Sequence, residues 1–216
     1  MKKAFLFTRT NTTVCKDACG HPSDALALER VLDRTVIVTT PVMVGAGAIV
    51  GDKVVTSLFL VGNYGQVSVR FRRGKKMSAF VTRRDTDRNL AELLPSSRGL
   101  KTSRHEPLAS SPEPHIGEVR SIGDPLLVPN VSTGVPQVHV AGTLYVTVLG
   151  GRFEDRWRIS PNEPRGFIGG AVWNAGGEFV GLTIGEKIHP RHDPTDRGFR
   201  SVYALPAECI MDFVES

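Results

Sequence analysis

Residues 166–185 hold the feature that most constrains the fold, a glycine-dense turn followed by two short apolar runs. The turn at 166–170 reads Gly-Phe-Ile-Gly-Gly, so its backbone can adopt bends that side chains would block. The runs at 171–173 and 179–184 flank Asn-Ala-Gly-Gly, residues that tolerate the positive φ angles of a tight hairpin. The stretch therefore predicts a β-hairpin that directly follows a sharply bent turn.

Short runs of the same kind extend along most of the 216-residue chain. Val67, Val69 and Phe71 alternate with polar residues, which is typical of a half-buried strand. Further strands are expected at 36–40, 43–50, 53–56, 78–82 and 90–94, and again at 125–128, 137–140, 143–149, 156–159 and 201–205. Helices are expected at 25–32 and 206–214. Two sets of about six strands predict an all-β fold of two six-stranded antiparallel β-barrels, with a short N-terminal helix and a C-terminal helix.

The composition changes between residues 95 and 114, where Ser, Pro, Arg and His replace most large apolar residues. Such a stretch is typical of a linker. The first twenty residues also lack a clear periodicity. We therefore divide the chain into an N-terminal arm at 1–22, a first barrel at 23–94, an inter-barrel linker at 95–116, and a second barrel with its helix at 117–216.

Five motifs resemble those of a known family, in the same order and at matching separations. Residues 45–56 resemble its Gly-Ser-Gly-x-Ile-x-x-x-Gly-x-Val-Leu-Thr, and residues 84–93 resemble Arg-Asp followed by Asp-Leu-Ala-x-Leu. Residues 122–128, 166–170 and 202–207 resemble Val-Gly-Asp-x-Val, Gly-Asn-Ser-Gly-Gly-Pro and Phe-Ala-Ile-Pro. The chain thus resembles the trypsin-like serine proteases, especially their HtrA branch. The resemblance implies the chymotrypsin fold and a Ser-His-Asp triad between two barrels.

Three replacements stand at the triad positions that the resemblance implies. Phe59 takes the place of the histidine, Asn89 that of the aspartate, and Ile168 that of the serine. Acyl transfer needs an oxygen nucleophile, an imidazole that takes its proton, and a carboxylate that stabilises the imidazolium. No histidine lies between residues 21 and 105 to replace the missing base. The sequence therefore predicts a pseudoprotease, a trypsin-like protein without hydrolytic turnover.

The former substrate cleft is expected to keep its shape without its chemistry. Phe59 and Ile168 are expected to pack across it as an apolar plug, worth about 3–5 kcal/mol if both side chains are fully buried. The resemblance also implies that an extended peptide adds a β-strand to the exposed edge at 182–184, unless loops block that edge. The candidate binding residues are Gly166, Phe167, Leu182, Thr183 and Ile184.

The net charge of +5 is uneven, with a basic patch in the first half of the chain. Its residues are Arg70, Arg72, Arg73, Lys75, Lys76, Arg83 and Arg84. Such a patch attracts phosphates or acidic proteins, or simply forms the solvated face of a sheet. We expect the chain to bind another protein, as a scaffold or structural subunit of a complex. The alternative is a nucleic-acid-binding module that uses the basic patch on structured RNA.

Cofactor, metal and membrane functions find little support in the sequence. Three cysteines, an odd number, do not indicate a disulfide framework. Cys15, Cys19 and His21 offer thiolate and imidazole ligands without an evident fourth ligand, so we expect free thiols and no metal. No apolar run reaches the roughly 18 residues of a membrane helix, and the run at 4–7 is too short for a secretory signal. We expect a cytoplasmic protein that has no cofactor, small-molecule substrate or membrane partner.

Overall fold

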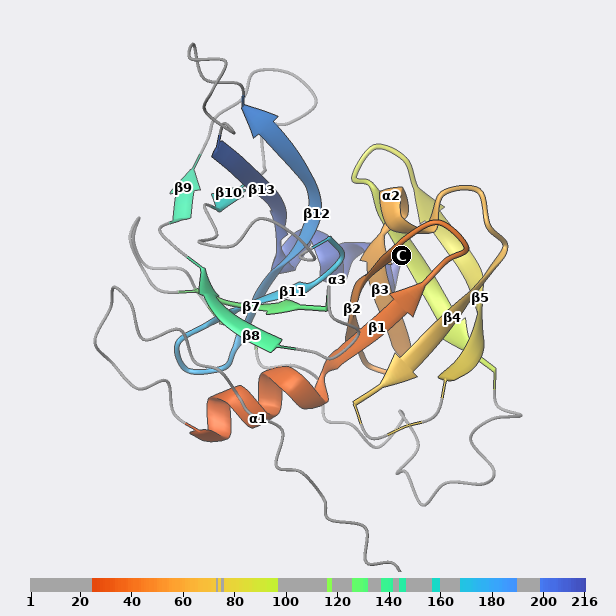
Figure 1. Cartoon of the computed structure of the whole chain (residues 1–216), viewed down its shortest axis with the longest axis horizontal. Helices are drawn as coiled ribbons and strands as arrows, with labels where there is room; N and C mark the ends of the chain where they lie inside the picture. Colours follow the sequence, from red (N-terminus) through yellow and green to blue (C-terminus); the bar gives the residue numbers. More distant parts are fainter. Residues whose placement is uncertain are drawn as a thin grey trace, which may run out of the picture.

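The computed structural model describes residues 25–72, 74, 76–96, 116–117, 126–131, 137–141, 144–146, 157–159, 168–189 and 199–216. Within these residues a barrel and a second β-sheet lie side by side, with short helices at their margins (Figure 1). The expected mainly β architecture is confirmed. The predicted arm at 1–22 and nearly all of the predicted linker at 95–116 lie outside the described residues.

The first half is a closed six-stranded antiparallel barrel, as the sequence predicts. Its strands are β1 (Thr35–Thr39), β2 (Val44–Val50), β3 (Lys53–Ser57), β4 (Gln66–Phe71), β5 (Lys76–Asp85) and β6 (Leu90–Pro95). They follow the order β1-β2-β3-β6-β5-β4, and pairing of β1 with β4 closes the barrel and leaves no strand edge. Val67 and Val69 of β4 are buried inside it, whereas Arg70 is exposed, which confirms the alternation read from the sequence.

A one-turn helix, α2 (Leu58–Val61), connects β3 to β4. The sequence did not predict it, because four residues are too few to show a helical period. Leu60 and Val61 are buried in the core of the barrel. The helix ends at Gly62, whose φ of 56° suits glycine and whose N–H donates to the carbonyl of Leu58 at 2.7 Å.

The second half is an open sheet of seven strands in the described residues. The strands are β7 (Leu126–Asn130), β8 (Gln137–Ala141), β9 (Leu144–Val146), β10 (Trp157–Ile159), β11 (Ala171–Asn174), β12 (Phe179–His189) and β13 (Phe199–Pro206). Their order is β8-β7-β11-β12-β13-β10-β9. The described strands therefore do not form the closed six-stranded second barrel expected from the sequence. A period of two identifies strands, but it does not show which strands pair.

The β11–β12 hairpin confirms the prediction made from residues 171–184. Gly177 adopts a φ of 75° and donates its N–H to the carbonyl of Asn174 at 3.0 Å. The Asn174 side chain accepts hydrogen bonds from the N–H groups of Gly176 and Glu178, both at 3.0 Å. The turn is therefore fixed by the residues that the sequence singled out.

Two helices contribute apolar side chains to the core between the halves. This core joins Val55 of the barrel, Trp173 and Leu182 of the sheet, and Phe213 of α3 (Ala207–Glu215). Helix α1 (Ala25–Asp33) runs beneath the sheet toward β1 and adds Val31 to the same core (Figure 1). A separate core fills the interior of the barrel. Burial of this shared apolar surface holds the two halves against each other.

Candidate functional site

The three expected triad positions lie on separate segments that meet between the barrel and the sheet. Phe59 lies in α2, Asn89 in the turn between β5 and β6, and Ile168 in the turn before β11. The backbone N–H of Phe59 donates to Oδ1 of Asn89 at 2.9 Å. The carbonyl of Ile168 accepts from the N–H of Ala46 in β2, also at 2.9 Å. The fold thus brings together residues that are far apart in the sequence.

Both ends of the Asn89 side-chain amide are engaged. Its Oδ1 accepts the hydrogen bond from Phe59, and its Nδ2 donates to the carbonyl of Ile184 at 2.7 Å and to Oγ of Ser57 at 3.3 Å. The buried hydroxyl of Ser57 also donates to the Ile184 carbonyl, at 2.7 Å. No local pattern in the sequence pointed to Ser57, because its partner Ile184 is 127 positions away. At this site the amide acts as a hydrogen-bonding bridge, and it carries no charge for an imidazolium.

The expected apolar plug of Phe59 and Ile168 is wrong. Phe59 is 60% exposed, so its ring is not buried against a partner. Ile168 is only partly buried and packs against the core of the barrel. The side chain of Phe59 projects outward because α2 has a single turn, and its inward positions are taken by Leu60 and Val61. The ring is therefore free to contact another molecule.

The turn that resembles the nucleophile turn is packed tightly on β2 and β3. Gly169 adopts a φ of 78°, and a Cβ at this position would overlap the carbonyl of Ala46 and Oγ1 of Thr56. Gly45 likewise has no room for a side chain, since its Cβ would lie 2.6 Å from Leu60 and 2.8 Å from the carbonyl of Ile168. The glycines of the two motifs thus allow close approach between the halves.

The expected binding strand is not an open edge at residues 182–184. Leu182, Thr183 and Ile184 are buried, and β12 lies between β11 and β13. The carbonyl of Thr183 accepts from Gly169, and its N–H donates to Gly170, both at 2.8 Å. The expectation of an added peptide strand at these three residues is therefore wrong, because their backbone groups already have partners. The other two candidates, at 166 and 167, lie outside the described residues.

Two carboxylates of helix α1 neutralise the charge of Arg72, a member of the predicted basic patch. Its guanidinium pairs with Glu29 at 2.5 Å and with Asp33 at 3.0 Å. Hydrogen bonding to Glu29 raises the pKa of Arg72, and the interaction with Asp33 raises it further. Arg72 therefore connects α1 to the end of β4. Two further members, Arg73 and Lys75, lie outside the described residues.

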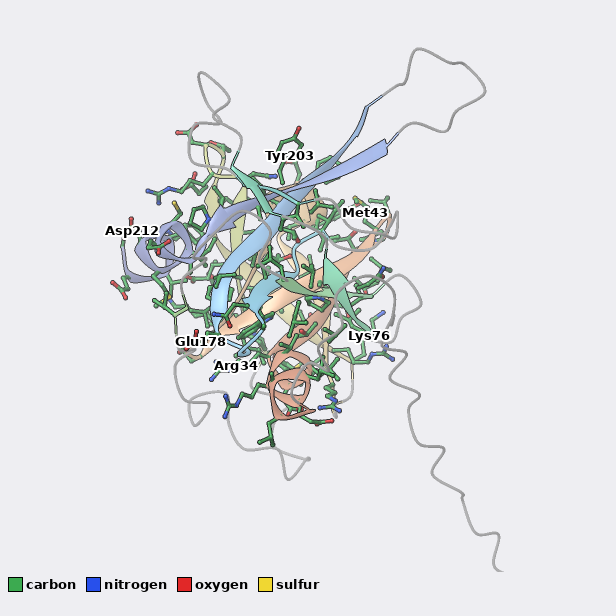
Figure 2. All side chains as sticks on the ribbon, turned by 90° about the vertical axis from the view of Figure 1, so that its left-hand side faces the viewer. Arg34, Met43, Lys76, Glu178, Tyr203 and Asp212 are labelled. Carbon is green, nitrogen blue, oxygen red and sulfur yellow. The ribbon has the colours of Figure 1, made fainter. Side chains whose placement is uncertain are left out.

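The other described members of the patch face different surroundings. The guanidinium carbon of Arg83 lies 4.5 Å from the centre of the Phe213 ring in α3, a cation–π contact. Arg84 donates instead to a backbone carbonyl between α2 and β4 at 2.8 Å. Lys76, at the start of β5, lies on the opposite side of the view in Figure 2 from Asp212 of α3, the helix that Arg83 contacts. Arg83 and Arg84 are consecutive in β5, so their side chains point to opposite faces of the strand, and the single basic face expected from the sequence is divided.

Lys53 connects a buried carboxylate of the barrel to the C-terminal helix. Glu92 is 7% exposed, pairs with Lys53 at 2.9 Å and accepts from Oγ1 of Thr82 at 2.6 Å. Burial acts to raise the pKa of the Glu92 carboxyl, but the hydrogen bonds and nearby cations together hold that pKa below its ordinary value. Lys53 also donates to the carbonyl of Val214 at 3.3 Å, at the end of α3.

Neither a metal centre nor a membrane helix is found in the described part of the chain. These residues contain no cluster of three or more His, Cys, Asp or Glu side chains that could hold a metal ion. The candidate group Cys15, Cys19 and His21 lies outside them. None of the described helices is long and apolar enough to span a bilayer.

The closed barrel, the second sheet and the C-terminal helix define a trypsin-like fold. A serine-to-alanine mutant of Rv3671c from M. tuberculosis H37Rv, in an inactive form, is similar with a TM-score of 0.63 and 18% identity over 88% of each chain. The Rv3671c protease in an inactive form is similar with a TM-score of 0.58 and 19% identity, covering 86% of this chain and 89% of that chain. No protein-family model and no curated protein sequence matches the chain. At this identity the similarity establishes the fold alone.

Proposed function

We propose that the chain is a catalytically inactive, HtrA-like member of the trypsin-like proteins that works in the cytoplasm by binding another protein. The observation that carries the proposal is the side chain of Phe59, which is 60% exposed at the position of the general base. A phenyl ring cannot take a proton from a nucleophile, but it offers apolar area to a partner. Asn89 and Ile168 supply neither the carboxylate nor the nucleophile of a triad.

Two further apolar side chains support a docking face near the former cleft. Val42 is 73% exposed and Val44 is 47% exposed, in the β1–β2 connection and at the start of β2. Val44 adjoins Gly45, which contacts Leu60, and Leu60 in turn adjoins Phe59. We call Phe59, Val42 and Val44 the Phe59 face. Exposed apolar side chains on neighbouring segments offer apolar contact area to a protein partner.

A strand edge next to this region offers a second means of binding. Pairing of β12 with β11 reaches only as far as Leu182, whereas its pairing with β13 continues to His189. Among the described strands, none pairs with β12 on its β11 side from Gly185 onward. Such an edge can accept an extended segment of a partner by β-augmentation. We therefore place the candidate edge at 185–189 in this proposal, in place of residues 182–184.

No observation favours the RNA-binding alternative over the protein partner. Arg72 pairs with Glu29 and Asp33 of α1, and Arg83 lies over the Phe213 ring of α3. Arg84 donates to a backbone carbonyl between α2 and β4. Affinity for nucleic acid rises with the number of cations that contact phosphates, and groups within the molecule already engage these three arginines. RNA is therefore kept as the second outcome of the binding experiment.

Catalytic inactivity is tested with the purified full chain on fluorescent casein and on an activated acyl ester. We expect no turnover above the rate of the buffer. The proposal of inactivity is refuted if hydrolysis copurifies with the chain and disappears in a single-residue variant of the chain.

Partner binding is tested by affinity purification of the tagged chain from its native cells, followed by mass spectrometry. We expect one stoichiometric protein partner, lost in Phe59→Ser and retained in Phe80→Ser. The control is matched, because Phe80 is also a half-exposed phenylalanine, at 51%, but lies on the outer face of β5. Retention of the partner by both variants would exclude the Phe59 face. Recovery of RNA that is lost in Arg70→Glu/Lys76→Glu would favour the alternative.

A further inference from the structure

Asn89 occupies a turn that also bonds to the opposite half of the molecule. Its φ is 60°, and among the described residues it alone has a positive φ without being glycine. Asparagine tolerates this left-handed conformation better than most residues with a side chain. The carbonyl of Asn89 accepts the N–H of Leu58 at 2.9 Å, so the turn is also fixed to the start of α2. Position 89 therefore has a backbone requirement that is independent of its side chain.

The hydrogen-bonding partners of the Asn89 side chain determine which end of its amide faces the barrel and which end faces the sheet. The N–H of Phe59 can only donate, so it requires the amide oxygen of Asn89. The carbonyl of Ile184 in β12 can only accept, so it requires the amide nitrogen. An aspartate of the same shape could still accept from Phe59, but its ionised carboxylate would face the Ile184 carbonyl without a proton to donate. The geometry therefore selects an amide over a carboxylate.

We propose that Asn89 is an inter-half bridge: its amide fastens β12 of the sheet to α2 of the barrel, and a carboxylate at this position weakens that junction. Ser57 acts in the same bridge, since its buried hydroxyl donates to the same Ile184 carbonyl. Asn89, at the position that resembles the catalytic aspartate, thus has a structural role. That role disfavours an aspartate at this position. The inference concerns stability and holds whether or not the chain binds a partner.

The test compares three variants of the full chain by urea unfolding at neutral pH. Asn89→Asp keeps the side-chain shape, and Asn89→Gly keeps the turn but removes the side chain. Asp87→Asn is the matched exchange in the same turn, at an exposed side chain. We expect both Asn89 variants to lower the folding equilibrium constant by about 10- to 100-fold, because each loses hydrogen bonds that the part-buried amide makes between the halves. We expect Asp87→Asn to change it less than about threefold.

Amide hydrogen exchange shows whether the loss of stability lies at the junction between the barrel and the sheet. The Ala46 amide donates across the halves to Ile168, whereas the Ile49 amide donates to Arg34 within the first half. We expect Asn89→Asp to accelerate exchange of Ala46 more than that of Ile49. A stability within twofold of the wild type, or equal acceleration of both amides, overturns the proposal. If Asn89→Asp does not fold, Ser57→Ala gives a milder break of the same bridge, judged by the same two amides.

Discussion

Replacement of Gly169 by alanine tests how tightly the turn before β11 must approach the barrel. Gly169 has a φ of 78°, and its N–H donates to Thr183 at 2.8 Å. An added Cβ would overlap the carbonyl of Ala46 and Oγ1 of Thr56, which are joined by a buried hydrogen bond of 2.6 Å. The substitution therefore has both a backbone effect and a contact effect.

The magnitude follows from these two effects. A left-handed conformation costs an alanine roughly 1–2 kcal/mol. Separation of Thr56 from Ala46 leaves a buried hydroxyl or carbonyl unsatisfied, which costs about 1–3 kcal/mol. We expect Gly169→Ala to lower the free energy of unfolding by about 2–5 kcal/mol, a large part of the stability of an ordinary domain.

Gly51→Ala is the matched control for the backbone effect. Gly51, in the turn between β2 and β3, has a φ of 58°, and its added Cβ would meet no atom within 4 Å. We expect Gly51→Ala to cost only the backbone term of about 1–2 kcal/mol. Urea unfolding of the two variants isolates the contact term as their difference. If Gly169→Ala is no more destabilising than Gly51→Ala, the tight approach of the turn to Ala46 and Thr56 does not exist in solution.

Three further predictions concern charge and packing. The pKa of Glu92 is lowered on folding, so its contribution to stability is present above its ordinary value of 4.5 and is lost as the pH falls through the folded pKa. Urea unfolding should therefore show a gap between wild type and Glu92→Gln that closes at acidic pH; a gap that persists there would contradict the role of the charge. Arg72→Met should cost less than about 1 kcal/mol in urea, and the cost should shrink in high salt, because its acidic partners are half exposed. Leu60→Ala should cost about 2–5 kcal/mol by thermal unfolding, because Leu60 is 1% exposed in the barrel core, whereas Leu94→Ala, at 45% exposure, should cost under about 1 kcal/mol.

Much of the fold was predictable because local patterns specify local structure. The alternation at Val67 and Val69, the hairpin at Asn174 and Gly177, and the helix after Pro206 all appear where the sequence indicated them. Helix α2 was not predictable, because one helical turn carries no period. The open second sheet in the described residues was also not predictable, because strand pairing depends on contacts between distant segments.

The candidate site was predictable in composition and less so in geometry. The sequence indicated that positions 59, 89 and 168 would meet, and the structure places all three segments at the junction of the halves. It did not show that Phe59 projects outward, because exposure depends on which residues of α2 turn inward. It also placed the binding strand at 182–184, where hydrogen bonds from the turn at 168–170 occupy the backbone.

The sequence by itself determined which chemical groups the chain can bring to a site. A chain with Phe59, Asn89 and Ile168 at these positions lacks a base, a carboxylate and a nucleophile there, whatever its fold. Only the tertiary structure decided how those groups are used. Asn89 bridges the halves because folding brings the Ile184 carbonyl, 95 positions away, to within 2.7 Å of its amide. Side-chain chemistry is fixed by the residue type, whereas partners, exposure and pKa arise from neighbours that are distant in the chain.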